Sequence, residues 1–146
     1  MQTSTCYQIA ISSLYTVVLA GAAIGCQVNL PDPPVDREVS FATEIQPIFT
    51  QRCAGCHSDG GFADNQGIPM RLVEGLTLDS IVNQPSSQDS GLTLVIPSDA
   101  ANSLLFLKVS ENDPPIGSTM PLIGEMLPSG ELGLIRDWID QGAMDN

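Results

Sequence analysis

Apolar residues recur at helical spacing in two stretches of the chain, one before and one after a middle region rich in glycine and proline. They are Ile45, Ile48 and Phe49 in the first stretch, and Leu132, Ile135 and Ile139, flanked by Leu134 and Trp138, in the second. Such spacings place the side chains on one face of an α-helix. The pattern predicts a first helix near residue 43 and a last helix from residue 129, with Trp138 packed on the first helix against Phe41, Ile45 or Phe49.

The residues at the ends of these two stretches indicate where each helix starts and stops. Thr43 is followed three residues later by glutamine, which fits a capping box, and Ser40 is the competing cap. Pro47 then lies in the first turn, where a missing N–H costs least. In the last helix Ser129 is the expected cap, and Gly142 is well placed to end the helix.

The middle region predicts short elements and long loops. The expected segments are a loop at 58–75, an extended piece with a helical turn at 76–82, a helix at about 98–109 and a proline-rich loop at 110–128. These features predict a small all-α domain. Because its helices are too short to make a thick core alone, a bulky apolar group in the middle would help to fill it.

The N-terminal stretch reads as a processing signal. Residues 9–25 carry no charge, and their apolar part is short for a membrane-spanning helix, which needs about 20 residues. The tetrapeptide Ala23-Ile24-Gly25-Cys26 resembles the lipobox of bacterial lipoproteins, in which the signal is cut before a cysteine that is then acylated. We therefore expect a signal peptide at 1–25 and lipidation at Cys26. A plain secretory signal or an uncleaved anchor is the alternative, and each places the domain outside the cytoplasm.

The residues after Cys26 suit a spacer between a membrane and a domain. Residues 27–38 are polar and contain three prolines, a composition typical of an extended, semi-rigid segment. With 146 residues, the chain has room for one domain and little more. The expected organisation is a signal peptide at 1–25, a lipidated, proline-rich tether at 26–39 and one domain at 40–146.

The charge balance narrows the class of partner. The chain has 17 acidic and 5 basic residues, a formal net charge of −12. Nucleic acid is disfavoured as a partner, because its phosphates would be repelled. The acidity can steer a basic protein toward this one, or it can serve only to keep the protein soluble.

The candidate chemistry lies in the pentapeptide CAGCH at residues 53–57. Cys53, Cys56 and the only histidine of the chain, His57, fall on one side of a helical turn. Two thiols can then meet the two vinyl groups of one haem while the imidazole reaches the iron. A zinc site needs a fourth ligand that no second cysteine pair supplies. A redox disulfide normally lies between a strand and a helix. These two sites and a chance occurrence are the alternatives.

A haem iron with one histidine needs its other face assigned, and a second histidine is absent from the chain. The methionines that follow Cys26 are Met70, Met120, Met126 and Met144. Met120 is followed by proline and lies in the proline-stiffened loop between the last two helices, a place from which a thioether can reach the iron. Met126, in the same loop, is the second candidate.

Several stretches together resemble a known family. The stretches are CAGCH, Gly75–Asp79, Val95–Pro97, Ser103–Leu105, Met120-Pro121 and Leu134–Ala143. They are similar to a c-type cytochrome domain, of the type found in planctomycete and related bacterial cell-surface proteins. The resemblance covers roughly residues 41–143. It departs from the usual Pro-Gly at Pro97-Ser98, which concerns a turn rather than the iron.

The resemblance implies an all-α cytochrome c-like fold around one covalent haem c, with Cys53 and Cys56 as thioether anchors and His57 and Met120 as axial ligands. It also implies that the carbonyl of Pro69 accepts a hydrogen bond from Nδ1 of His57 and so orients the ring.

The expected function is one-electron transfer outside the cytoplasm, in the periplasm or at the cell surface of a bacterium, between redox partner proteins. On this interpretation the protein is an electron carrier and not an enzyme, held to a membrane by its lipid. The alternatives are a haem domain with an open or labile sixth position, serving as a ligand-binding, sensor or peroxidase-like module, and a non-haem CxxC metal or redox module.

Overall fold

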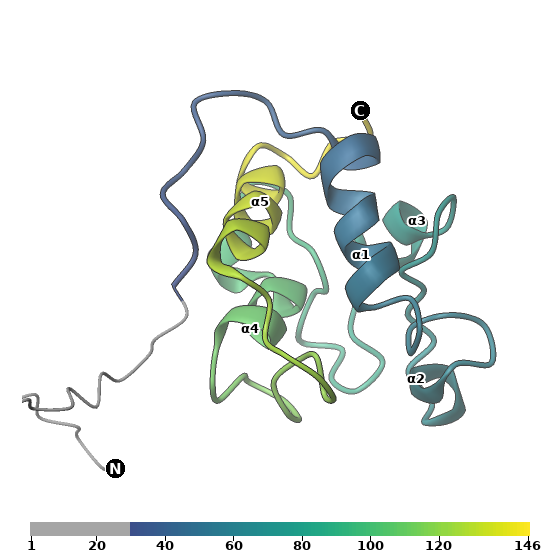
Figure 1. The fold of residues 1–146 in the computed structure, drawn as a ribbon. Coiled ribbons are helices and arrows are strands. Elements are labelled where there is room, and N and C mark those ends of the chain that lie inside the picture. Colours follow the sequence, from purple (N-terminus) through teal and green to yellow (C-terminus); the bar gives the residue numbers. More distant parts are fainter. Residues whose placement is uncertain (1–29) are drawn as a thin grey trace, which may run out of the picture.

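Short helices joined by long loops make up the part of the chain that the computed structural model describes, residues 30–146 (Figure 1). In order they are η1 (Phe41–Ile45), α1 (Gln46–Arg52), α2 (Phe62–Asn65), α3 (Thr77–Ile81), η2 (Ala100–Asn102), α4 (Leu104–Ser110) and α5 (Ser129–Asp140). Over these residues no strand forms, and β-structure is limited to the isolated bridges Val82–Val95 and Pro85–Thr93. The predicted all-α class is confirmed for residues 30–146.

The predicted signal peptide and Cys26 lie outside the described residues. Within 30–146, the helices are all too short or too polar to span a bilayer. The described part of the predicted tether is attached to α5. The backbone N–H of Asp32 donates to the carbonyl of Ser129 at 3.0 Å, and that of Val35 donates to the carboxylate of Asp137 at 2.8 Å. This part of the predicted tether is therefore hydrogen-bonded to the domain.

Ser40, and not Thr43, caps the first helix. The Ser40 hydroxyl accepts the N–H of Thr43 at 3.3 Å, and the Ser40 N–H donates to the Glu44 carboxylate at 3.0 Å. These reciprocal bonds satisfy backbone donors that the first turn of a helix leaves free. The helix opens as the wider π-turn η1 and continues as α1. The change occurs just before Pro47, whose nitrogen has no hydrogen to donate and would interrupt the regular bonding in any case.

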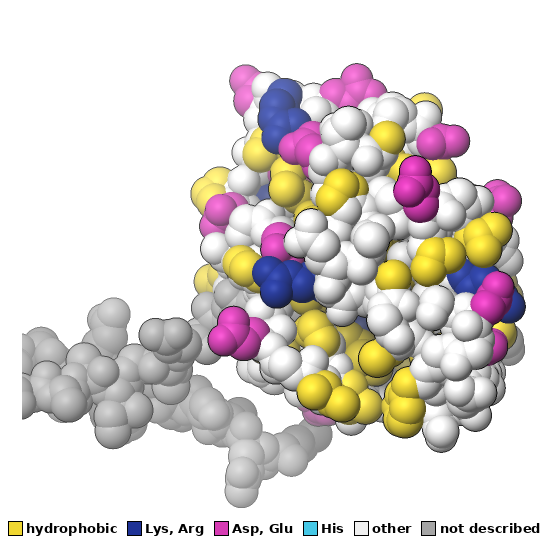
Figure 2. Space-filling model, turned by 45° about the vertical axis from the view of Figure 1, so that its right-hand side comes forward, with side chains coloured by type: hydrophobic (Ala, Val, Ile, Leu, Met, Phe, Trp, Pro, Cys, Tyr) yellow, Lys and Arg dark blue, Asp and Glu magenta, His cyan; other side chains and the backbone are white. Residues whose placement is uncertain are grey.

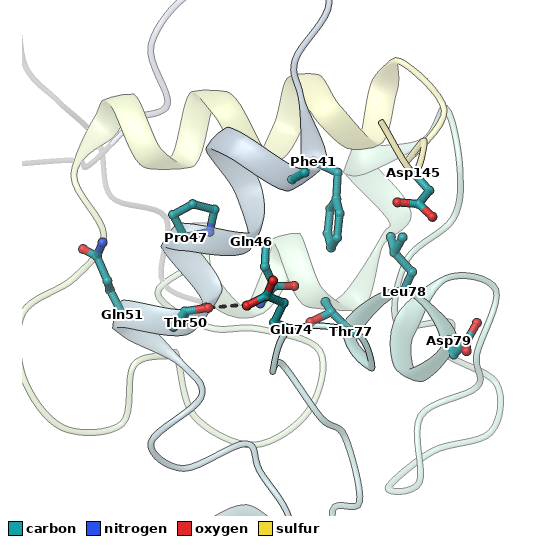
Figure 3. A pocket seen from close by; sticks show the side chains of 12 residues that line it. Phe41, Gln46, Pro47, Thr50, Gln51, Glu74, Thr77, Leu78, Asp79 and Asp145 are labelled. Atoms are coloured by element: carbon teal, nitrogen blue, oxygen red, sulfur yellow. Dashed lines mark hydrogen bonds between the residues drawn. The ribbon is translucent and has the colours of Figure 1, made fainter.

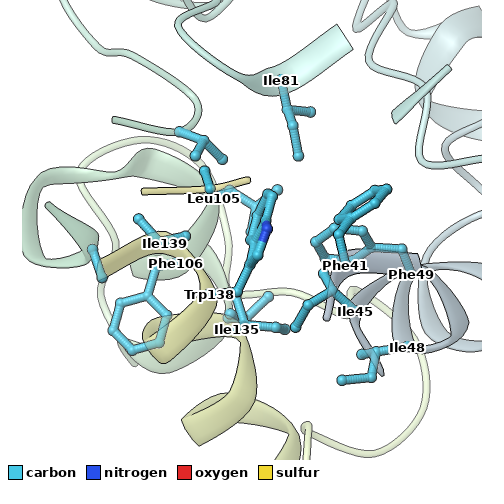
Figure 4. Packing of buried hydrophobic residues seen from close by; sticks show 14 of the residues in the cluster. Phe41, Ile45, Ile48, Phe49, Ile81, Leu105, Phe106, Ile135, Trp138 and Ile139 are labelled. Carbon is cyan, nitrogen blue, oxygen red and sulfur yellow. The ribbon is translucent and has the colours of Figure 1, made fainter. Parts of the chain in front are cut away.

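Trp138 of α5 lies at the centre of the core, as the sequence predicted. Only 1% of its surface is exposed, and its ring lies 5.4 Å from that of Phe41 and 6.3 Å from that of Phe49, between centroids (Figure 4). The second contact is edge-on, a geometry that aromatic quadrupoles favour. The indole N–H donates to the carbonyl of Met144 at 3.0 Å, so burial leaves the indole N–H paired. Helix α5 is thereby fixed across η1 and α1.

Three predictions for the middle of the chain need correction. The loop at 58–75 contains the single turn α2, and residues 77–81 are helical from the start. The helix expected at about 98–109 is split into η2 and α4 at Ser103, which is fully buried in an extended conformation. Its hydroxyl donates to the carbonyl of Asp99 at 2.8 Å and accepts the N–H of Ile96 at 2.8 Å. These local bonds replace those that a continuous helix would have made there.

Helix α5 begins and ends almost as predicted. Its first residue is Ser129, and the cap position itself belongs to Pro128. At the other end Gly142 has a φ of +107°, a conformation that glycine adopts without strain. The N–H of Ala143 then returns to the carbonyl of Trp138 at 2.9 Å, which closes the helix.

Candidate functional site

The CAGCH segment forms a tight turn directly after α1. The N–H groups of Cys56 and His57 both donate to the carbonyl of Cys53, at 3.0 and 2.9 Å, and the Cys53 N–H continues the helix to Phe49 at 2.9 Å. Both thiols are free, with Cys53 partly buried and Cys56 exposed. The turn therefore presents two separate thiols and one imidazole along a short length of chain.

These three side chains line a cavity of about 950 Å³ that is bounded mainly by apolar groups. One wall of the cavity is formed by the CAGCH turn and the loop that follows it. The opposite wall is formed by the loop that precedes α5. Its lining includes every site residue predicted within the domain: Cys53, Cys56, His57, Pro69 and Met120. Residues 67 positions apart in the sequence, Cys53 and Met120, are thus brought to one space.

The rim of this cavity exposes large apolar side chains. The exposed fraction is 56% for Phe62, 45% for Leu76, 54% for Leu122 and 85% for Ile123. Figure 2 shows hydrophobic side chains gathered at the lower edge of one face of the molecule, with the charged groups mainly above and beside them. Apolar groups that surround a concave space are typical of ligand and cofactor sites.

The surroundings of Cys53 oppose thiolate chemistry. Burial raises the pKa of this thiol to about 11, and the negative charge of Glu131 adds to the effect. Redox-active CxxC motifs need the opposite shift, because the thiolate is the reacting form. The environment of the motif therefore disfavours the thioredoxin-like alternative.

The environment of His57 favours the neutral imidazole, which is the form that binds a metal. Burial lowers the pKa of this side chain, and the nearby backbone of Met70 opposes that effect only in part. The Nδ1 atom is buried and makes no hydrogen bond to the described residues. The bond predicted from this nitrogen to the carbonyl of Pro69 is therefore absent, and that carbonyl accepts a bond from the Arg71 guanidinium at 2.9 Å.

Gly61 allows the chain to return against the CAGCH turn. A Cβ atom at this position would lie 2.5 Å from the carbonyl oxygen of Cys56, a distance that requires the backbone to move. Just beyond, the N–H of Ala63 donates to the same oxygen at 3.1 Å, and the N–H of Leu72 donates to the carbonyl of His57 at 2.8 Å. The segment after His57 thus stabilises the turn through hydrogen bonds to its last two carbonyls.

The four candidate methionines differ in their placement. Met120 is partly buried, packs against the core and lines the cavity. Met126, the second candidate, is 39% exposed, and Met144 is 57% exposed; neither lines the cavity. Met70 does line it, from the same segment as Pro69. Of the two sequence candidates, only Met120 lines the cavity, and Met70 is a further thioether on its wall.

Sequence reasoning missed Lys108, which also lines the cavity. Burial lowers the pKa of its ammonium group. The signal in the sequence was that this is the only lysine of an acidic chain and lies in an apolar helix. Over residues 30–146, no cluster of three or more His, Cys, Asp and Glu side chains could hold a metal ion.

A second pocket, of about 560 Å³, lies on another face of α1 (Figure 3). Its polar lining includes Gln46, Thr50, Glu74 and Asp145. The amide nitrogen of Gln46 donates to the hydroxyl of Thr50 at 3.1 Å. None of the site residues predicted from the sequence borders this pocket, so the candidate chemistry belongs to the larger cavity.

Comparison of the chain with models of protein families, with curated proteins and with solved structures gave no match.

Proposed function

We propose that the protein is a monohaem c-type cytochrome that carries single electrons outside the cytoplasm. The observation that carries this proposal is the cavity shared by the CAGCH turn and Met120. A chance CxxCH motif would have no reason to face a large apolar space, nor to have a thioether on the wall of that space.

The donor set and the space both suit a haem. A volume of about 950 Å³ lies within the range of about 300–1,000 Å³ that is common for cofactor sites. Cys53 and Cys56 would hold the group through thioether bonds, and His57 and Met120 would be the axial ligands. When bound, haem supplies one-electron chemistry by cycling between Fe(II) and Fe(III).

The residues of this chain would hold that group and control its surroundings. His57, kept neutral by burial, offers an imidazole nitrogen, and Met120 offers a thioether that favours a high reduction potential. The apolar floor, including Leu105, Val109 and Ile135, would exclude water from most of the site. The open rim leaves an edge at which an electron can enter or leave.

The setting of the domain follows from the same proposal. The signal peptide at 1–25 would direct export, and the lipidated Cys26 left after its cleavage would hold the domain at a bacterial membrane, in the periplasm or at the cell surface. The net charge of −12 would favour redox partners with a basic docking face and disfavour nucleic acid. The protein changes no bond in a substrate, so we class it as an electron carrier and not as an enzyme.

The test is the haem content and the visible spectrum of protein made in cells that have a cytochrome c maturation system. We expect a haem stain that survives a denaturing gel, and a ferric spectrum with a methionine–iron charge-transfer band. The band should disappear in Met120→Ala and persist in the matched control Met126→Ala. An unstained wild-type protein from cells that mature a reference cytochrome would refute the proposal. A stained protein without the band would favour the sensor or peroxidase-like alternative.

A further inference from the structure

The basic residues of the chain divide into two kinds by their partners. The four arginine pairs are Arg37–Glu44, Arg52–Glu131, Arg71–Asp59 and Arg136–Asp137. Lys108 alone among the five basic residues forms no ion pair, although the chain has 17 acidic residues. All five basic residues lie in the described part of the chain, so this contrast is complete.

The ammonium group of Lys108 is instead bound to the loop that carries Met120. Its Nζ donates to the carbonyl of Ile116 at 2.7 Å and also to the carbonyl of Ser118. The carbonyl of Lys108 in turn accepts the backbone N–H of Met120, also at 2.7 Å. Lys108 of α4 therefore makes hydrogen bonds to residues 116, 118 and 120 of this loop, and residue 120 is the proposed ligand.

The loop is shaped to admit this contact. Gly117 lies between the two bound carbonyls with a φ of +62°, and a Cβ at this position would lie only 3.2 Å from Nζ of Lys108. The hydroxyl of Thr119 donates to the carbonyl of Glu111 at 2.8 Å, which fastens the same loop to the residue after α4. A partly buried ammonium loses hydration, and charge-assisted bonds to carbonyls are what offset that loss.

We propose that Lys108 is the positioning residue for Met120, holding the 116–120 loop so that the thioether stays at the cavity. This inference rests on the proposed function, because the position of Met120 matters to the chemistry only if haem is bound. Methionine ligation needs a loop that resists detachment, since the thioether itself is a neutral, weakly held ligand. Hydrogen bonds at residues 116, 118 and 120 supply that resistance.

The experiment compares Lys108→Met, which keeps an unbranched side chain but removes the donors, with Lys108→Arg, which keeps donors and charge. Arg37→Met is the matched control for loss of one positive charge, since Arg37 pairs with Glu44 away from the cavity. Gly117→Ala disturbs the same contact from the loop side and serves if Lys108→Met does not fold. Each variant is measured for covalent haem stain, for the methionine–iron band, and for hydrogen exchange at the Met120 amide.

We expect Lys108→Met to keep the haem stain, to lose most of the band and to exchange the Met120 amide about tenfold faster or more. Lys108→Arg should recover at least part of the band, and Arg37→Met should leave both readouts unchanged. An unchanged band and an unchanged exchange rate in Lys108→Met, or in Gly117→Ala in its place, would overturn the inference. Failure of the wild-type protein to stain for haem refutes the proposed function instead, and the exchange rate then still decides whether Lys108 holds the loop.

Discussion

The two halves of this molecule use apolar side chains in different ways. Where η1 and α1 meet α5, the side chains fill the space among themselves, and Trp138, Ile45 and Phe49 are almost wholly buried (Figure 4). On the other side, the CAGCH turn and the loop of Met120 face each other across a cavity of about 950 Å³. There Ile123 and Phe62 stand 85% and 56% exposed at the rim.

This contrast indicates which part of the fold is stabilised by contacts within the chain alone. A packed interface stabilises by burial and by dispersion contacts, whereas apolar groups that line an open space gain neither in full. The packed half therefore needs nothing beyond the chain. The side chains that line the cavity are apolar like those of a core but lack the contacts of one, as we expect if the proposed haem occupies the cavity.

The largest expected effect is the loss of the haem, which should change the cavity half and leave the packed half unchanged. The double variant Cys53→Ala/Cys56→Ala should carry no covalent haem, because each thioether requires one of these sulfurs. Hydrogen exchange should then become faster in residues 57–76 and 116–123, while the amides of α5 and α1 stay protected. The readouts are a haem stain on a denaturing gel and exchange followed by mass spectrometry.

The control for this pair is Cys26→Ala, which should keep the haem stain while losing any lipid on the mature protein. Haem retained by the double variant would contradict the assignment of the anchors. Equal loss of protection in both halves would contradict the division of the molecule.

Within the packed half, Trp138→Ala should lower the free energy of unfolding by about 3–5 kcal/mol, the usual cost of removing a large buried aromatic. The matched change in the cavity half is Ile123→Ala at the exposed rim, for which we expect about 0.5 kcal/mol or less. Denaturant titration of both variants measures the difference. Similar costs for the two would mean that the rim is packed as tightly as the core.

Beside the CAGCH turn, Gly61→Ala should cost about 1–3 kcal/mol, since the new Cβ would lie 2.5 Å from the carbonyl oxygen of Cys56. Gly55→Ala is the matched control inside the CAGCH motif, because a Cβ there meets nothing within 4 Å. Thermal unfolding of the two variants, combined with haem yield, tests this pair. Equal stability would show that the turn moves without cost.

The same division explains how far the sequence could be read. The packed half was predictable because its information is local: helical spacing placed Trp138 on the first helix, and a glycine marked the end of α5. The start of the first helix was misassigned to Thr43, because Ser40 and Thr43 carry similar capping signals. What distinguishes them is that the Ser40 hydroxyl accepts the N–H of Thr43 while the Ser40 N–H donates to the Glu44 carboxylate.

In the candidate site, CAGCH could be found from the sequence because residues at this spacing lie on one side of a helical turn. That Met120 lines the cavity and Met126 does not depends on the path of a loop, which spacing does not encode. The role of Lys108 is of the same kind, since its bonds reach carbonyls 8 and 10 residues away. The packing of residues 32–39 on α5 was missed because proline-rich, polar composition is equally typical of a free spacer.

The smallest expected effect concerns the outer edge of the packed half, where Glu44 joins Arg37 to the first turn of the helix. The Arg37 guanidinium and the Ser40 N–H together lower the pKa of this carboxyl to about 2. Because the pKa in the folded protein is below the usual value near 4.5, the stabilisation is present above pH 4.5 and is lost as the pH falls toward 2. Glu44→Gln should therefore lower the free energy of unfolding by about 0.2–1 kcal/mol at pH 7, a small effect because the pair is exposed to solvent. The difference from the wild-type protein should shrink below pH 4.5. If the stability difference between Glu44→Gln and the wild-type protein stays constant down to pH 2, Glu44 acts through packing and not through its charge. The edge of the packed half would then be stabilised in the same way as its centre.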